Sequence, residues 1–133
     1  MATKIFVNLP VHNLDQSIRF FTSIGYSFNK QFSDDTAACM VVSEDIYTML
    51  LTIPKFKEFT KKDICDKEKA IEVILALSSD SKEEVDSIIT KAIEAGGKEP
   101  RPIMDLGFMY TRCFEDPDGH LWEVFWMDPL AVQ

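Results

Sequence analysis

The chain has 133 residues, of which 46% are hydrophobic, and a formal net charge of −8. This length and composition are typical of one globular domain with a sizeable core, while the acidic balance argues against nucleic acid or anionic lipid as a partner. No apolar stretch approaches the length of a membrane span, and three cysteines without zinc-ligand spacing indicate free thiols in the cytoplasm.

The first part of the chain changes period from strand to helix and back. Residues 4–11 alternate apolar side chains with others and predict a strand. Residues 13–25 change to helical spacing, with Asn13 and Gln16 in capping-box positions and Gly25 as the stop. Strand patterns then follow at residues 26–33, 37–44 and 47–53.

A charged segment separates the two halves of the chain. Residues 54–69 begin with a proline and carry many charges but no strand alternation, so they predict a linker with a helical turn or two. Phe56 and Phe59 leave two interpretations open. The segment is either a connector packed by two aromatic rings or a lid over a binding site.

The second half repeats the order of the first. Residues 70–79 predict a strand, and residues 81–97 predict a helix that begins with Ser81 and Glu84 in capping-box spacing and stops at two glycines. Further strand patterns cover residues 98–104, 107–115 and 120–127. The sequence therefore predicts an α+β fold in which a β-α-β-β-β module occurs twice. Module one covers about residues 3–53, the linker 54–69, and module two about 70–128.

Two motifs within this duplicated plan resemble those of a known superfamily. "VHNLDQSIRFFTSIGYSF" is similar to its strand exit and first helix, and "FEDPDGHLWEVFW" is similar to its D-P-D-G-x-x-x-E hairpin. The chain thus resembles the vicinal-oxygen-chelate superfamily, which includes glyoxalase I, extradiol dioxygenases and the bleomycin-resistance proteins. The resemblance covers essentially the whole chain. It implies two modules whose mixed sheets curl into an open structure around one cavity, in a protein that forms a homodimer.

In metal-dependent members of that superfamily, each module supplies two metal ligands, one from its first strand and one from its last. The matching positions are Phe6 and Leu50 in module one and Glu72 and Glu123 in module two. Phe6 and Leu50 have no donor atom, and a two-residue shift offers only weak neutral donors such as Asn8. A catalytic transition-metal site needs at least three protein donors. We therefore expect no metal cofactor, and any divalent metal that does bind would use Glu72 and Glu123.

The role of Glu123 has alternatives. A tight hairpin turn would place Arg112 opposite Glu123, where its guanidinium neutralises the carboxylate. The same turn would place Tyr110 opposite Phe125 on that face. Alternatively, Glu72 and Glu123 lie close enough to share a proton and act as a catalytic acid/base pair, or Glu72 points to solvent.

The remaining candidates are side chains around Glu123. Trp122, Val124 and Trp126 alternate with Glu123 and are expected to pack as core beneath a helix. The predicted ligand-binding residues are Phe6, Asn8, Met40, Leu50, Arg101, Tyr110, Arg112, Leu121 and Phe125, with Arg101 at the mouth of the cavity. Two functions fit this set. One is a metal-free protein of the bleomycin-resistance kind that binds a hydrophobic or cationic small molecule. The other is a metal-dependent lyase or dioxygenase of the glyoxalase type with Glu123 as ligand or base.

Overall fold

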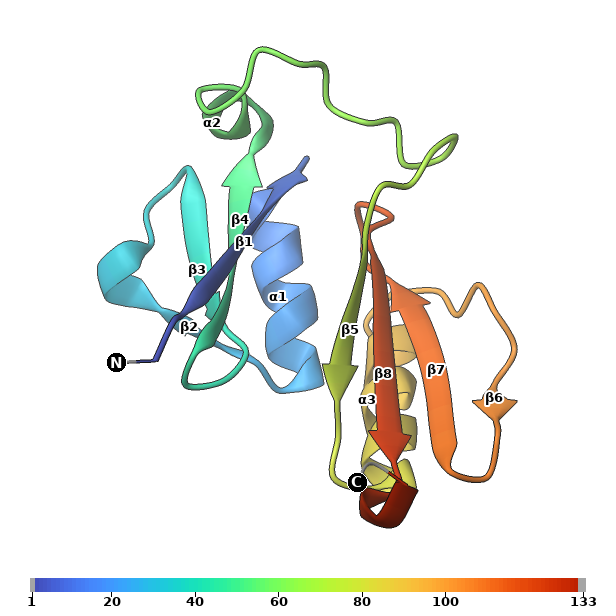
Figure 1. Cartoon of the computed structure of the whole chain (residues 1–133). Coiled ribbons are helices and arrows are strands. Elements are labelled where there is room, and N and C mark those ends of the chain that lie inside the picture. The colour runs from blue at the N-terminus through green and yellow to red at the C-terminus, as the bar shows by residue number, and fades with distance from the viewer. Residues whose placement is uncertain (1, 132–133) are drawn as a thin grey trace. The chain divides into compact units, whose positions relative to one another are not determined.

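The computed structural model describes residues 2–131, and the chain divides into two compact units, Met1–Cys65 and Asp66–Gln133. Each unit contains a four-stranded mixed sheet, and a long helix lies against one face of that sheet (Figure 1). Neither sheet closes into a barrel. The predicted α+β fold with a repeated β-α-β-β-β order is confirmed.

The first unit contains β1 (Ile5–Val11), α1 (Leu14–Ile24), β2 (Ser27–Asn29), a 3-10 turn (Lys30–Phe32), β3 (Ala37–Val41), β4 (Ile46–Thr52) and α2 (Ile53–Phe56). Its sheet has the order β1-β4-β3-β2, in which β1 and β4 are parallel and the other pairs are antiparallel. The second unit contains β5 (Ile74–Ser78), α3 (Lys82–Glu94), β6 (Met104–Asp105), β7 (Met109–Glu115), β8 (Leu121–Met127) and a 3-10 turn (Pro129–Ala131). Its order, β5-β8-β7-β6, repeats the first.

Both long helices begin where the capping patterns predicted. The Asn13 side chain accepts a hydrogen bond from the Gln16 backbone N–H, and the Ser81 hydroxyl accepts one from the Glu84 backbone N–H. These side chains satisfy backbone donors that have no partner inside the first helical turn. Gly25 ends α1 with a φ of 121°, which favours glycine because a Cβ atom would be strained there.

Three strands are much shorter than their sequence patterns suggested. β2 ends at Asn29, because the Asn29 side chain accepts a hydrogen bond from the Gln31 backbone N–H and starts a 3-10 turn. The region 98–104 contributes only an isolated bridge at Lys98 and the start of β6. Its two prolines lack the N–H that a ladder requires. The first strand of the second unit begins at Ile74, so the preceding residues are outside the sheet.

The core of each unit lies between its helix and one face of its sheet. In α1 the buried apolar residues are Leu14, Phe20, Phe21 and Ile24, and in α3 they are Val85, Ile89 and Ala92. Trp122 and Val124 of β8 are almost completely buried, and the Lys82 ammonium of α3 lies 5.4 Å from the Trp126 ring centre. The prediction that these β8 residues pack beneath a helix is confirmed. None of the helices within residues 2–131 has the length and apolar character needed to cross a membrane.

Candidate functional site

The second sheet has two faces with different chemistry, and Glu123 lies on the face away from α3. Tyr110 Oη donates a hydrogen bond to Asp86 Oδ1 of α3 at 2.6 Å, and Arg112 Nη1 donates to the same oxygen at 2.9 Å. Tyr110 and Arg112 therefore point toward the helix. Glu123 is directly opposite Cys113, the neighbour of Arg112 on β7. Because successive strand residues point to opposite faces, Cys113 and Glu123 point away from α3.

We call this surface the Glu123 face. It is defined by Ala76 of β5, Thr111 and Cys113 of β7, and Leu121, Glu123 and Phe125 of β8. Ala76 is exposed beside Glu123, and Leu121 and Phe125 are half-buried. The face thus combines apolar side chains with one carboxylate at its centre.

The predicted pairing of Arg112 with Glu123 is wrong, because the hairpin turn is longer than the tight turn assumed. The last paired residues are Glu115 and Leu121, and the Asp116 side chain holds the turn by accepting hydrogen bonds from the backbone N–H groups of Asp118 and His120. This turn shifts the register by one residue. Such a shift moves a side chain to the opposite face of the sheet.

Arg112 instead has two acidic partners on the helix side. Its Nε and Nη2 atoms both donate to the Glu99 carboxylate at 2.8 Å, and Nη1 donates to Asp86. The Glu99 carboxylate raises the pKa of Arg112, and the hydrogen bond from Tyr110 holds the pKa of Asp86 below its usual 3.8. Tyr110 itself pairs with Trp126 rather than Phe125. Arg112 and Tyr110 therefore belong to an ion-pair cluster on the helix side of the sheet and not to the Glu123 face.

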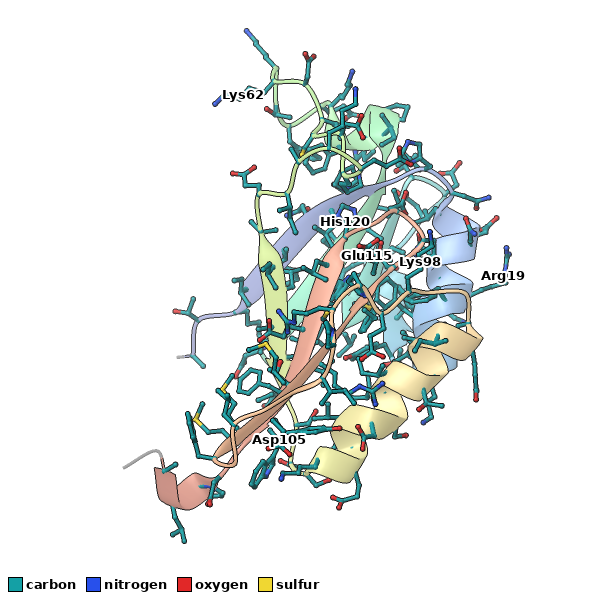
Figure 2. The ribbon with its side chains drawn as sticks, turned by 90° about the vertical axis from the view of Figure 1, so that its right-hand side faces the viewer. Arg19, Lys62, Lys98, Asp105, Glu115 and His120 are labelled. Carbon is teal, nitrogen blue, oxygen red and sulfur yellow. The ribbon has the colours of Figure 1, made fainter. Side chains whose placement is uncertain are left out.

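The partner of Glu123 is Arg101, whose Nη2 atom lies 3.2 Å from Glu123 Oε2. The segment that carries Arg101 runs along the edge of β7 away from β8, because Lys98 bridges to Glu115 there (Figure 2). To reach Glu123 on β8, the Arg101 side chain must cross β7. It crosses beside Cys113, which is directly opposite Glu123 and only 1% exposed. This burial raises the pKa of the Cys113 thiol.

Two buried polar atoms on this side of the sheet have no hydrogen-bond partner among residues 2–131. They are Arg101 Nε and Thr111 Oγ1. Thr111 lies on β7 two residues from Cys113, and so on the same face. Buried polar groups in native proteins are nearly always paired, so an unpaired one calls for an explanation.

Glu72 is not the neighbour of Glu123. It is exposed and precedes β5, whereas the β5 residue opposite Glu123 is Ala76. Four residues of extended chain span roughly 13 Å, which separates the two carboxylates along the sheet edge. The alternative in which Glu72 points to solvent therefore describes the structure, and the shared-proton alternative is wrong.

In the first unit the predicted candidates fall on opposite faces of the sheet. Phe6 is 48% exposed and stacks on Tyr47 at 4.7 Å, and Asn8 is exposed on the same face of β1. Leu50 is opposite Leu9, and Leu9 is an odd number of residues from Phe6 along β1. Leu50 and Phe6 therefore point to opposite faces of the sheet. Met40 is on the Leu50 face as well, since it pairs with Thr48.

Leu50 and Met40 are both completely buried. Because Phe6 and Asn8 stay exposed, the apolar side of α1 covers the face of Leu50 and Met40. The expectation that these two buried residues line a binding surface together with Phe6 and Asn8 is wrong. The ligand-binding role of Phe6 and Asn8 stays a prediction.

The donor set does not fit the metal centre that the resemblance implies. Phe6 and Leu50 offer no ligand atom, Glu72 lies outside the sheet, and Glu123 is paired with a guanidinium. Within residues 2–131, the structure brings together no group of three histidine, cysteine or acidic side chains that could hold a metal ion.

The position of Arg101 gives a direct prediction about Cys113. Arg101→Ala should expose the thiol, because the guanidinium covers this part of β7. We expect Cys113 in the variant to react with iodoacetamide at least tenfold faster than in the wild type, as measured by mass spectrometry of peptides. Cys39, which is buried in the first unit, should be unchanged, and the exposed Cys65 should react quickly in both proteins. Equal Cys113 rates in both proteins would show that Arg101 does not cover the thiol.

The sequence analysis missed Cys113 and Thr111 as members of the site. The predicted register places Tyr110 and Arg112 opposite Phe125 and Glu123, and the one-residue shift puts Thr111 and Cys113 there instead. The signal that was available is Asp116 itself, since an aspartate before Pro-Asp-Gly favours a longer turn closed by its own side chain. Arg101, which was predicted at the mouth of a cavity, is the residue that the structure brings to Glu123.

Comparisons with known proteins agree with this architecture. A family model described as the Glyoxalase/Bleomycin resistance protein/Dioxygenase superfamily matches residues 5–124. The fold is similar to a hypothetical protein from S. aureus, with a TM-score of 0.80 and 23% identity over 95% of this chain and 94% of that chain.

Two further solved structures have the same fold. One is a glyoxalase/bleomycin resistance protein/dioxygenase family enzyme from Burkholderia phytofirmans, with a TM-score of 0.77 and 15% identity over 95% of this chain and 99% of that chain. The other is the fosfomycin resistance protein FosX from Mesorhizobium loti, with a TM-score of 0.70 and 13% identity over 98% and 97%. Likeness at these identities shows the fold alone. No curated protein matches the chain.

Proposed function

Because the chain belongs to the glyoxalase/bleomycin resistance protein/dioxygenase superfamily, we propose that it binds a small, largely apolar molecule on the Glu123 face without the family's full metal site. The observation that carries the proposal is the ion pair between Arg101 and Glu123. A carboxylate that already has a cationic partner needs no metal ion to compensate its charge.

The surroundings of the ion pair support an apolar ligand. Leu121 and Phe125 flank Glu123 on β8, and the small side chain of Ala76 leaves the β5 side of Glu123 open. Glu123 and Arg101 keep 18% and 32% of their side chains exposed, so the pair can still be contacted. Binding sites for small molecules commonly combine apolar walls with a few placed polar groups.

The alternative function is a metal-dependent lyase or dioxygenase in which Glu123 acts as a ligand or base. It is favoured by the position of Glu123 in the D-P-D-G-x-x-x-E hairpin, which corresponds to the acidic ligand of metal-dependent relatives. For either role Arg101 must first release Glu123. The two functions therefore differ in the metal content of the purified protein.

Two measurements on one preparation test the proposal. Protein purified without chelators should contain far less than one equivalent of transition metal. It should also bind the neutral dye N-phenylnaphthylamine saturably. Ala76→Arg should abolish dye binding by filling the Glu123 face, and Ser87→Arg, at an exposed position of α3, should leave it unchanged.

Near one equivalent of metal that disappears in Glu123→Ala but persists in Glu115→Ala would overturn the proposal. That result would favour the enzyme. Dye binding that Ala76→Arg leaves intact would mean that the molecule binds elsewhere on the chain.

We also propose a homodimer in the cytoplasm. Support for the dimer comes from exposed apolar side chains on the edge strands β1 and β5, such as Ile5 and Ile74. Support for the cytoplasm comes from the three cysteines, none of which forms a disulfide bond. Exposed apolar surface on an edge strand favours association with another chain. Sedimentation at micromolar concentration should give twice the mass of one chain, and the mass of a single chain would contradict the dimer.

A further inference from the structure

The Glu123 face carries two hydrogen-bond donors that no group within the described residues 2–131 accepts from. Arg101 donates to Glu123 through Nη2, but within this range its buried Nε has no partner, and neither has the buried hydroxyl of Thr111. Arg112 provides the contrast on the other face of the same strand, since its Nε, Nη1 and Nη2 all donate to carboxylates. Leaving a buried donor unpaired lowers stability, so these two atoms are candidates for contacts with a ligand.

The two donors lie close to one another. Thr111 is opposite Phe125, two residues from Glu123 on β8, so Thr111 and Glu123 are diagonal neighbours about 7 Å apart. Arg101 contacts Glu123 directly. A ligand oxygen placed between Thr111 and the part of the Arg101 side chain that covers Cys113 is therefore within reach of both side chains.

Charge on this face restricts the ligand. The positive charge of Arg101 is already compensated by Glu123, and Glu115 adds a second carboxylate on the same face of β7. Lys98 is opposite Glu115 on the same face, so a ligand carboxylate would meet two carboxylates and two cations, with no surplus positive charge to attract it. A ligand cation cannot accept hydrogen bonds from the two donors. A neutral oxygen acceptor can.

A weakly attached segment can give a ligand access to the buried donors. Residues 102–108 are exposed throughout. They join the sheet through the two-residue strand β6, in which Met104 is opposite Thr111, and through backbone hydrogen bonds at Leu106 and Phe108. Asp105, labelled in Figure 2, is held on the helix side by an ion pair with Lys82 at 3.7 Å. Segments with so little buried surface open locally at low cost. When this one moves, Thr111 is uncovered, and Met104 and Leu106 can pack on an apolar ligand.

We propose that the molecule bound on the Glu123 face is electrically neutral and carries a carbonyl-type oxygen that accepts hydrogen bonds from Arg101 Nε and Thr111 Oγ1. This inference rests on the proposed function and names the ligand class for the same face. The guanidinium keeps its ion pair with Glu123 through Nη2, while its Nε–H donates a hydrogen bond to the ligand.

The test compares three naphthalene dyes that share one ring system. They are the neutral ketone prodan, the corresponding dimethylaminonaphthalene carboxylate, and dimethylaminonaphthalene without a carbonyl group. Wild-type protein should bind prodan at least tenfold more tightly than either of the others, since the carbonyl accepts two hydrogen bonds and each is worth about fivefold in affinity. Binding is followed by the fluorescence shift of each dye.

Two variants separate the donors from general packing. Thr111→Val keeps the side-chain shape but removes the hydroxyl, and Arg101→Lys keeps the charge beside Glu123 but removes the Nε–H. Each should weaken prodan about fivefold and leave the carbonyl-free dye unchanged. Thr111→Val should also unfold at no lower urea concentration than wild type, because it removes an unpaired buried group. Thr48→Val, a buried threonine substitution in the first unit, is the matched control and should alter no dye.

The outcomes distinguish the inference from the proposed function. Equal affinity for prodan and the carbonyl-free dye, with Ala76→Arg abolishing both, would overturn the inference and leave the proposed function standing. Tightest binding of the carboxylate would overturn the neutral ligand class. If none of the three dyes binds, both the inference and the proposed function fail.

Discussion

Replacing Arg112 by methionine is expected to lower the free energy of unfolding by about 3 kcal/mol at pH 7, the cost of leaving a partly buried charge without its partner. Methionine keeps most of the apolar stem but removes the guanidinium that holds Glu99 through two bonds and Asp86 through one. Glu99 is only 21% exposed, so water would solvate its carboxylate charge poorly once the guanidinium is gone. Urea unfolding measures the loss.

The double variant Arg112→Met with Glu99→Gln is the matched control. It removes the unpaired charge and should recover more than half of the loss. A double variant no more stable than the single one would show that Glu99 and Arg112 do not act as a pair.

The loss should also depend on pH through Asp86. The Tyr110 hydroxyl, and then Arg112, hold the pKa of Asp86 below 3.8 in the folded protein. A lowered pKa stabilises the folded state above the unfolded value, and this contribution disappears as pH falls through the folded pKa. The difference between wild type and Arg112→Met should therefore shrink below about pH 4. Asp86 is half exposed, so this part of the effect is the smaller one.

The second large effect is expected at Asp116, in the hairpin turn that sets the register of the Glu123 face. Its Oδ1 atom accepts from two backbone N–H groups, of Asp118 and His120, and its Oδ2 atom accepts from Trp122 Nε1 at 3.1 Å. Asp116→Ala removes all three hydrogen bonds at a position where Asp116 is only 5% exposed. We expect a loss of about 3 kcal/mol in the free energy of unfolding.

Asp128→Ala is the control for Asp116→Ala. Asp128 follows the other end of β8, and its side chain accepts one exposed backbone hydrogen bond, from Leu130. Its removal should cost less than about 1 kcal/mol. Similar losses for the two variants would mean that the Asp116 hydrogen bonds do not hold the hairpin.

Features that depend on neighbours in the chain could be predicted from the sequence. The capping residues Asn13 and Ser81 start the two long helices, and Gly25 ends the first, because these groups satisfy the backbone within one or two turns. The repeated order of strand and helix patterns gave the α+β fold, and the D-P-D-G-x-x-x-E motif indicated the hairpin that carries Glu123. Burial of Trp122 and Val124 followed from alternation along one strand.

Features that depend on pairing between distant segments could not be predicted. The turn around Asp116 adds one residue to the register, and that single residue moves Arg112 to the helix side and Cys113 to the side of Glu123. Nor does any local pattern indicate that Arg101, 22 residues before Glu123, crosses β7 to reach it.

The sequence by itself therefore determined the two modules, their helices and the acidic residue at the centre of the candidate site. Only the tertiary structure decided which guanidinium neutralises that acid and which donors remain unpaired beside it. The physical reason is that helix caps and strand alternation arise from contacts within a few residues. The face on which a side chain lies depends instead on register, which turn geometry and packing across the sheet fix together.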